Sequence, residues 1–464
     1  MRRLLAPVLI AAACALAIWQ VFANGFDEAW LMGDFRAFYC AGAVLLHGGN
    51  PYLAAPMLAC EQTPLPFGLH SMKPGVGLPA PFPAYALLLF SIFSLLPYPV
   101  AAIVWLIVSV AATIAACIFL AKLCDRPPLV VFAMLAIGFC IAVIPYGELA
   151  PVIMAALTGS ALALREGRYA AAAIALLFVA LLPHAAFPVF LALLVWVPRM
   201  RLPVVAVSLL LAAIDLAAGP RLALLYVTAV LPSHAASEIG YIMQYSATWL
   251  AQGLGASDRV ALLAGDISYG LMVAIGVTLS RLLVSRFGDP AFFLLIPTAF
   301  AVAGGPFVHY SEITLALPAA LLLYSYSAGT ARVAAAVALV LMAAPWEWIM
   351  TQPKLVLPIV LGAGLVAAIV LPAPARIWLR VGLGAAVFCA TCMFFAAYFG
   401  PQITPHVASV SIDPSLAEAS WGKFISTYTS SSGFVWLFAK LPTWIGLLAL
   451  ALGAVRAISP TLAR

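Results

Sequence analysis

Apolar runs about as long as a membrane crossing recur along the sequence from Leu4 to Val455. A helix needs roughly 20 apolar residues to cross a hydrocarbon core about 30 Å thick. Hydrophobic residues make up 66% of the chain and charged residues only 8%, which is typical of a polytopic membrane protein. No alternating strand pattern appears, and open sheet edges are not tolerated in lipid. We therefore expect an all-α membrane protein that forms a single integral membrane domain over residues 1–464.

The distribution of basic residues decides whether residues 81–123 cross the membrane once or twice. With 98–122 as the one crossing, 15 of the 22 basic residues lie on the cytoplasmic side, whereas a second crossing at 83–96 leaves only seven there. The 14 residues of 83–96 also span only about 21 Å as a helix, which is too short to cross. This segment, bounded by Pro83 and Pro97, is expected to lie at the outer membrane surface.

The resulting topology has about 12 to 14 transmembrane helices with both termini inside. Residues 1–23 have the basic start of a secretory signal, but their apolar stretch is longer than a usual signal core, so we expect an uncleaved anchor. The pair of segments around 181–190 is short enough to be a half-membrane hairpin. Long outer loops are expected at 24–97, 220–259 and 400–433. The expected crossings are 4–23, 98–122, 128–145, 149–164, 169–184, 186–198, 203–219, 260–281, 290–307, 311–327, 331–346, 355–372, 377–399 and 434–455.

The loops indicate on which side any chemistry occurs. The inner loops are short and contain no P-loop, so we expect chemistry at the outer face without cytoplasmic ATP. The eight cysteines show no CxxC or zinc spacing. Cys40 and Cys60 share the first outer loop, and they can pair if that loop faces an oxidising compartment.

Asp34 is the leading candidate for a catalytic acid or base. It lies about ten residues past the first crossing and precedes the apolar run FRAFYCAGAVLLHGG, which is too short to cross. Such a run would lie along the interface and hold a carboxylate at the depth of the lipid headgroups. The neighbouring Asp27 and Glu28 are closer to the first helix end and have the pattern of a solvated linker.

Four segments of the chain resemble one known family. They are GDFRAFYCAGAVLLHGGNPY (33–52), PAPFPAYALLLFSIFSLLPYPVAAIVW (79–105), YGELAPVIMAALTGSALALREGRYAAA (146–172) and GGPFVHYSEITLALPAALLL (304–323). In order and spacing they are similar to the DUF2029 family, the polyprenol-phosphate-mannose-dependent mannosyltransferases and related enzymes of glycosyltransferase family 87, which have the GT-C fold. The resemblance covers residues 1–330. Residues 331–464 would then add C-terminal transmembrane helices around outer loop 400–433.

The resemblance implies a glycosyltransferase in a bacterial inner membrane, active at the periplasmic face. A sugar, mannose or another hexose or pentose, would leave a polyprenyl phosphate and join an acceptor hydroxyl with inversion. The acceptor would be a glycolipid or polysaccharide, and no nucleic-acid partner is expected. An inverting transfer needs a carboxylate to take the acceptor proton and cations or donors to stabilise the departing phosphate. The family's first-loop aspartate maps onto Asp34.

The phosphate side maps onto His309 and Tyr310, which match the family's His-Tyr pair. The alternative is that Tyr310 belongs to an interfacial aromatic belt and His309 is incidental. Arg36 and Lys73 share the first loop with Asp34. Each of these two side chains either approaches the phosphate or is simply solvated. Two tyrosines of the family-like opening segment are expected to contact substrate, namely Tyr39 and Tyr52.

Three positions depart from the family pattern. Glu148 stands where the family usually has Gln, and it either binds a sugar hydroxyl or favours a helix N-terminus through the macrodipole. Leu182 occupies the family's lysine position, so His184 either supplies the missing donor or fills the interface. Gln244 stands where the family frequently has Asn. A polar contact is kept there, but the side chain reaches a different distance.

Two other classes of protein are alternatives to a glycosyltransferase. A transporter or lipid-linked-sugar flippase would need ionisable residues near the bilayer midplane, where only Asp215 and Asp266 come close, and an inverted repeat, which the sequence does not show. A non-catalytic envelope scaffold would leave the aromatic first loop unexplained. No cofactor is expected. No DxD pattern occurs. Because acids in separate outer loops are able to bind a divalent ion, metal dependence is left open.

Overall fold

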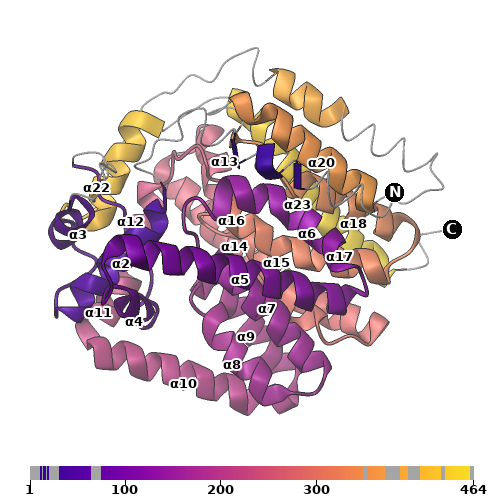
Figure 1. The fold of residues 1–464 in the computed structure, drawn as a ribbon, viewed down its shortest axis with the longest axis horizontal. Coiled ribbons are helices and arrows are strands. Elements are labelled where there is room, and N and C mark those ends of the chain that lie inside the picture. The colour runs from indigo at the N-terminus through magenta and orange to yellow at the C-terminus, as the bar shows by residue number, and fades with distance from the viewer. Residues whose placement is uncertain are drawn as a thin grey trace.

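The computed structural model describes residues 11–12, 14–16, 18–19, 31–63, 75–348, 353–370, 387–395, 408–429 and 434–459. Within these ranges the chain is mainly helical (Figure 1), and an antiparallel bridge joins Leu53 to Leu416. The all-α expectation is therefore confirmed.

The helices follow the apolar runs of the sequence closely, and several end or begin at proline or glycine. Short π-helical turns at 139–143 and 226–230 continue two of them. The helices are α2 (Gly33–Leu46), α3 (Ala54–Glu61), α4 (Ala84–Phe93), α5 (Tyr98–Cys124), α6 (Pro128–Gly138), α7 (Ala150–Arg165), α8 (Tyr169–Val179), α9 (Pro183–Trp196), α10 (Arg201–Ala218), α11 (Pro220–Leu225), α12 (Leu231–Ser237), α13 (Ala247–Gly253), α14 (Asp258–Phe287), α15 (Phe292–Gly304), α16 (Tyr310–Ile313), α17 (Leu317–Tyr326), α18 (Gly329–Met342), α20 (Val356–Val370), α22 (Ala417–Phe424) and α23 (Phe434–Ile458).

Four helical stretches in the described ranges are long and apolar enough to cross a membrane: Tyr98–Cys124, Pro198–Ala218, Asp258–Phe287 and Trp436–Ile458. The chain is thus a multi-pass membrane protein. Several other expected crossings are apolar helices of only 10–17 residues, so the count of 12 to 14 crossings stays a prediction. The expected crossings at 4–23 and 377–399 fall largely outside the described residues.

The ambiguous region 81–123 contains one short helix and one long helix, as expected. The ten residues of α4 are followed after Pro97 by the 27 residues of α5. Helix α4 lies tightly against α2, because the Ser91 hydroxyl donates to the Gly42 carbonyl at 2.9 Å and a Cβ at Gly42 would lie 2.5 Å from main-chain atoms of α4. Asp215 of α10 accepts the Tyr85 main-chain N–H at 2.9 Å. This carboxylate therefore caps α4, whose N-cap residue is a proline without a side-chain acceptor.

The segments expected as long outer loops contain helices of their own. The first contains α2, α3 and α4, the second α11, α12 and α13, and the third α22. The helices of the second and third segments were not predicted, because runs of six to eight residues carry too little periodicity to identify them. Helix α22 is joined to the first segment by main-chain bonds from Ala54 to Ser415 at 2.8 Å and from Ala417 to Tyr52 at 2.9 Å. In Figure 1 these helices, apart from α13, gather at the left end of the molecule.

A disulfide joins Cys40 of α2 to Cys60 of α3, as the sequence allowed. It closes a segment with a sequence separation of 20 residues. The bond fixes α3 beside α2 at the end of the molecule where the short helices gather.

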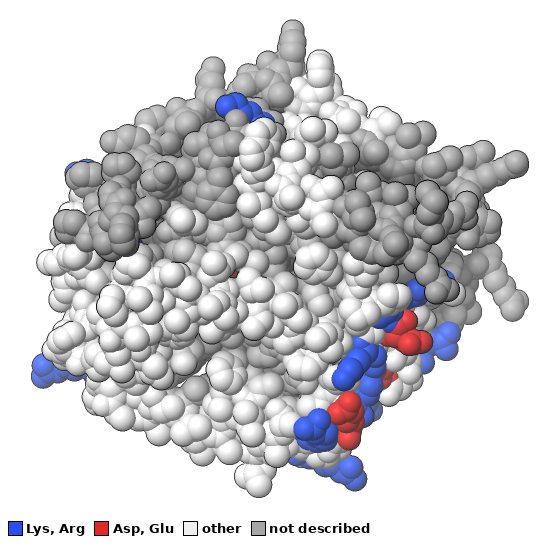
Figure 2. Space-filling view, viewed as in Figure 1, with Lys and Arg blue, Asp and Glu red and all other residues white. Residues whose placement is uncertain are grey.

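Charged side chains gather mainly along one edge of the view in Figure 2, and most of the remaining visible surface is uncharged. Arg165 forms an ion pair with Asp289 and also donates to the Leu123 carbonyl at 2.8 Å. The turns after α5, α7 and α14 therefore lie together at the same end of the bundle. The expected topology places all three turns on the same side of the membrane.

Candidate functional site

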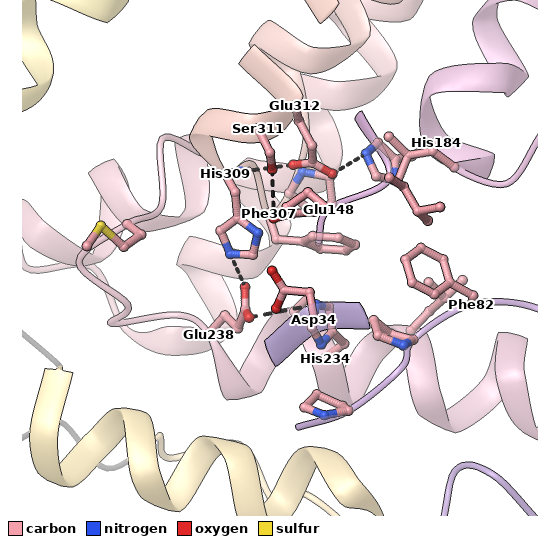
Figure 3. Close-up of a pocket in the computed structure, with 18 of the residues that line it drawn as sticks. Asp34, Phe82, Glu148, His184, His234, Glu238, Phe307, His309, Ser311 and Glu312 are labelled. Carbon is pink, nitrogen blue, oxygen red and sulfur yellow. Dashed lines mark hydrogen bonds and ion pairs between the residues drawn. The ribbon is translucent and has the colours of Figure 1, made fainter. Parts of the chain in front are cut away.

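A cavity of about 630 Å³ lies among α2, α7, α9, α12, α14 and α16. Its lining includes six carboxyl side chains and three of the chain's six histidines. Figure 3 shows that many of these polar side chains point toward one another from separate segments. The acidic, histidine and serine residues of the lining are Asp34, Glu148, His184, His234, Glu238, Asp266, His309, Ser311, Glu312 and Glu347.

Asp34 reaches the cavity from the first turn of α2. Two main-chain bonds fix the start of this helix to the segment before α7: Met32 N–H donates to Pro145 at 2.7 Å, and Asp34 N–H donates to Tyr146 at 3.0 Å. These bonds satisfy N–H groups that a helix start leaves unpaired. The position of the Asp34 carboxyl is thus set by a segment more than 100 residues away in the sequence.

Gly147 allows the two segments to approach so closely. It has a φ of 76°, and a Cβ at this position would lie 2.6 Å from the Phe35 Cβ. Its carbonyl accepts the indole N–H of Trp105 at 2.8 Å, while the Trp105 ring stacks on Phe35 at 5.3 Å. Only glycine adopts this backbone conformation without strain and also leaves room for Phe35. The next residue, Glu148, is thereby directed into the cavity.

Asp34 and Glu148 form a carboxyl pair. Both side chains line the cavity, and the Ser311 hydroxyl donates to Glu148 Oε1 at 3.0 Å. Burial raises the pKa of Asp34 well above its ordinary value, and the neighbouring Glu148 charge raises it further. Burial likewise raises the pKa of Glu148, although the positive charge of His309 opposes that rise. Burial and mutual repulsion therefore both favour a proton on the pair.

His309 is held by a carboxylate. Its Nε2 lies 2.9 Å from Glu238 Oε2, the same oxygen that accepts the Gln244 amide. Burial alone would lower the pKa of His309, but the ion pair with Glu238 raises it to about 10. His309 is therefore an imidazolium at neutral pH, and Asp34 is among the groups that feel its charge.

Glu238 stays ionised although it is almost fully buried. Burial would raise its pKa, but the charges of His309 and His234 and the hydrogen bonds it accepts lower the pKa to about 2. One of these bonds comes from the Trp421 indole N–H at 2.9 Å. Helix α22 of the third outer segment thus contributes to the same site.

A second histidine–carboxylate pair lies beside the first. His184 Nε2 is 2.8 Å from Glu312 Oε1, and the other oxygen of Glu312 accepts the His309 main-chain N–H at 2.9 Å. Glu312 therefore caps α16 and binds His184 at the same time.

Gln244 is positioned from behind by a buried lysine. The Lys440 ammonium donates to the main-chain carbonyls of Ile242, at 2.6 Å, and of Gln244. It also lies over the rings of Tyr245 and Trp249, 4.7 Å and 4.4 Å from their centroids. Helix α23 thereby fixes the segment that holds His309.

Not all predicted ligands lie at the cavity. Asp34, Glu148, His184, His309 and Tyr310 line it, and the Tyr310 hydroxyl also donates to the Met342 carbonyl at 3.0 Å. Gln244 lies just behind the lining and contacts the cavity only through His309 and Glu238. Three predicted residues lie outside the lining, namely Arg36, Tyr39 and Tyr52, and Lys73 falls outside the described residues.

Helix geometry explains why Arg36 and Tyr39 lie outside. Positions two and five residues after Asp34 are rotated by about 200° and 140° around a helix. Arg36 donates to the Thr63 carbonyl at 2.8 Å, and Tyr39 donates to the Leu96 carbonyl at 2.9 Å. Tyr52 is buried, and its hydroxyl donates to the Phe82 carbonyl at 2.9 Å. All three contacts stabilise the first outer segment.

Several cavity residues were not predicted from the sequence. The most closely connected are Glu238, Glu312, His234, Glu347 and Trp421. Glu312 had a usable signal, because it stands three residues after His309 in the spacing of a capping box. His234 and Glu238 are four residues apart, a spacing that brings side chains together on a helix. Trp421 and Glu347 had no comparable local signal.

No lysine or arginine of the described residues lines the cavity, so its imidazoles are the cations available there. In the part of the chain that the structure describes, no three His, Cys, Asp or Glu side chains are grouped to hold a metal ion.

The other wall of the cavity is apolar and reaches the outer surface of the helices. Phe187 of α9 and Val227 after α11 line the cavity, yet their exposed fractions are 55% and 62%. The cavity therefore joins a charged half to an apolar half that is open at the surface of the helices.

Comparison of the sequence with known protein families, with curated proteins and with solved structures finds no match. The class that fold and cavity define is a helical multi-pass membrane protein with a polar cavity beside an apolar wall.

Proposed function

We propose that this protein is a GT-C-type glycosyltransferase of a bacterial inner membrane. It would transfer a sugar, mannose or another hexose or pentose, from a polyprenyl phosphate to an acceptor hydroxyl at the periplasmic face. The acceptor would be a glycolipid or a polysaccharide end. The sequence resemblance of residues 1–330 suggests this reaction, and the cavity is compatible with it.

The observation that carries the proposal is the position of Asp34. Its carboxyl lies in a cavity that also contains the His309 imidazolium and an apolar wall that is open at the surface of the helices. A polyprenyl-phosphate sugar needs all three features: an apolar surface for the chain, a cation near the phosphate and a base near the sugar. Such polar groups beside an apolar wall are typical of a ligand site.

In the proposed reaction, a lone pair of the acceptor oxygen attacks the anomeric carbon from the side opposite the phosphate. The bond between the anomeric carbon and the phosphate oxygen breaks, and its electron pair leaves with the polyprenyl phosphate. The acceptor proton passes to the Asp34 carboxyl group, which acts as general base. The His309 imidazolium offsets the charge of the phosphate, and His184 lies close enough in the lining to assist.

The test uses purified protein in lipid nanodiscs, polyprenyl-phosphate sugars with a labelled sugar, and acceptor lipids from a strain that lacks the gene. Such a strain should contain a glycan that is one sugar shorter, which supplies the natural acceptor. Asp34→Asn should lower transfer by about 10²- to 10⁴-fold, the usual loss for a general base. Donor binding should remain, because the carboxylate acts on the acceptor.

Asp125→Asn is the matched control, because Asp125 is an exposed C-cap residue outside the cavity lining and should leave transfer unchanged. Asp34→Asn protein that turns over like wild type would remove Asp34 as the base. A flippase or carrier would move the labelled lipid across the membrane and form no new glycosidic bond, so the same assay separates these two functions.

A further inference from the structure

Asp34 and Glu148 lie on segments that main-chain contacts hold together. The bonds from Met32 to Pro145 and from Asp34 to Tyr146 tie α2 to the segment that ends in Glu148, and Gly147 lets that segment lie against Phe35. Two carboxyls fixed in this way cannot separate to relieve the repulsion of their charges. One of them must then retain a proton.

The surroundings give the two carboxyls different roles. Glu148 receives the Ser311 hydroxyl at 3.0 Å, a bond that favours its ionised form. Asp34 faces Glu148, the His309 imidazolium and the ionised Glu238, whereas Glu148 faces His309 and Glu312. Hydrogen bonding therefore favours a proton on Asp34 directed at a charged Glu148.

We propose that Asp34 and Glu148 act as one proton-sharing pair, in which Glu148 is a positioning residue that accepts the Asp34 proton rather than a ligand of the sugar. This inference rests on the proposed function. In the resting site the pair holds one proton and one negative charge. The acceptor proton passes to Asp34 while the proton already on Asp34 passes to Glu148, so the pair becomes neutral as the phosphate leaves. One proton then returns to water and restores the resting state.

The first test measures protonation without any sugar, so it is independent of the proposed reaction. A hydrophobic carbodiimide reacts with protonated carboxyls in apolar surroundings, and peptide mass spectrometry locates the product at each pH. Wild-type protein should be labelled at Asp34 near neutral pH. In Glu148→Gln, the loss of the neighbouring charge should move the labelling midpoint of Asp34 to lower pH by about one unit or more.

Two further variants keep this test sharp if Glu148→Gln folds poorly. Ser311→Ala removes the hydroxyl that favours the charged form of Glu148, so labelling should move from Asp34 to Glu148. Glu347→Gln neutralises another carboxyl of the same cavity and is the matched control, for which the Asp34 midpoint should stay in place. An Asp34 midpoint that does not respond to Glu148→Gln, or that responds equally to Glu347→Gln, overturns the pair.

The second test is a double-mutant cycle in the transfer assay. Residues that act as one unit give losses that do not add. Asp34→Asn/Glu148→Gln should therefore lose little more activity than the more damaging single variant. If the losses of the two single variants multiply, and Glu148→Gln alone raises the donor KM, then Glu148 makes a separate contact with the sugar and the pair is overturned. If no transfer occurs in any variant but the labelling shift is found, the proposed function fails while the pair stands.

Discussion

Glu238 Oε2 lies 2.9 Å from His309 Nε2, and the same carboxylate also accepts the Trp421 indole and the Gln244 amide. One buried carboxylate thus joins the segment after α12, the turn before α16 and helix α22. This connection makes the charge of His309 depend on residues from three separate parts of the chain.

The ion pair should make stability depend on pH in a defined window. The pKa of His309 is raised from 6.5 to about 10, so its contribution is complete below 6.5 and is lost as the pH rises through about 10. The pKa of Glu238 is lowered from 4.5 to about 2, so its contribution is complete above 4.5 and is lost as the pH falls through about 2. Thermal unfolding of wild type and Glu238→Gln should therefore differ most between pH 4.5 and 6.5.

The expected cost of Glu238→Gln in that window is on the order of 3 kcal/mol, because removal of one partner leaves the other buried without compensation. His47→Gln serves as a control, since His47 is exposed and bonds only to the Ala43 carbonyl of its own helix. A stability difference that stays constant from pH 5 to pH 10 would contradict the ion pair.

Gly147→Ala should destabilise the protein and lower transfer together. A residue with a Cβ is strained at a φ of 76°, and the added carbon would lie 2.6 Å from Phe35. We expect a loss of about 1–3 kcal/mol in unfolding free energy, together with displacement of Glu148 from Asp34. Gly167→Ala is the matched control, because Gly167 has a φ of 73° and no atom within 4 Å of its Cβ position. Equal effects of the two substitutions would show that the close approach to Phe35 is unimportant.

The disulfide should stabilise the first outer segment. Its loop, with a sequence separation of 20, corresponds to about 3 kcal/mol in the chain-entropy treatment of crosslinks. A Cys40→Ala/Cys60→Ala variant should unfold at lower temperature than wild type and should no longer respond to a reducing agent. Cys117→Ala, which changes a free buried cysteine, should keep the wild-type response to reduction. Wild-type protein that is insensitive to reduction would contradict this role.

Opposite ends of the bundle should label from opposite sides of the membrane. Cysteines introduced at the exposed positions Ser411 and Glu166 should react with an impermeant maleimide from the periplasmic and cytoplasmic sides, respectively. Reaction of both from the same side would contradict the proposed location of the cavity at the periplasmic face.

The sequence by itself determined the class of protein and the course of the first outer segment. Run length and charge asymmetry are properties of short, continuous stretches, so they identified the 27-residue α5, the short α4 before it and the helix that begins at Gly33. The same local reasoning found Asp34 and the Cys40–Cys60 pair. A helix period of 3.6 residues, applied to α2, would also have turned Arg36 and Tyr39 away from Asp34.

Only the tertiary structure decided which charges meet. Glu238, Glu312 and Trp421 come from segments that are distant in sequence, and none stands in a pattern that names its partner. Their proximity depends on helix packing, for example on the contact of Gly147 with Phe35 and on the pairing of α22 with the first outer segment. Such packing depends on the shapes of many side chains at once, whereas a sequence pattern reports one stretch at a time. The sequence therefore supplied Asp34, Glu148 and His309 as candidates, and the folded chain brought them together in one cavity.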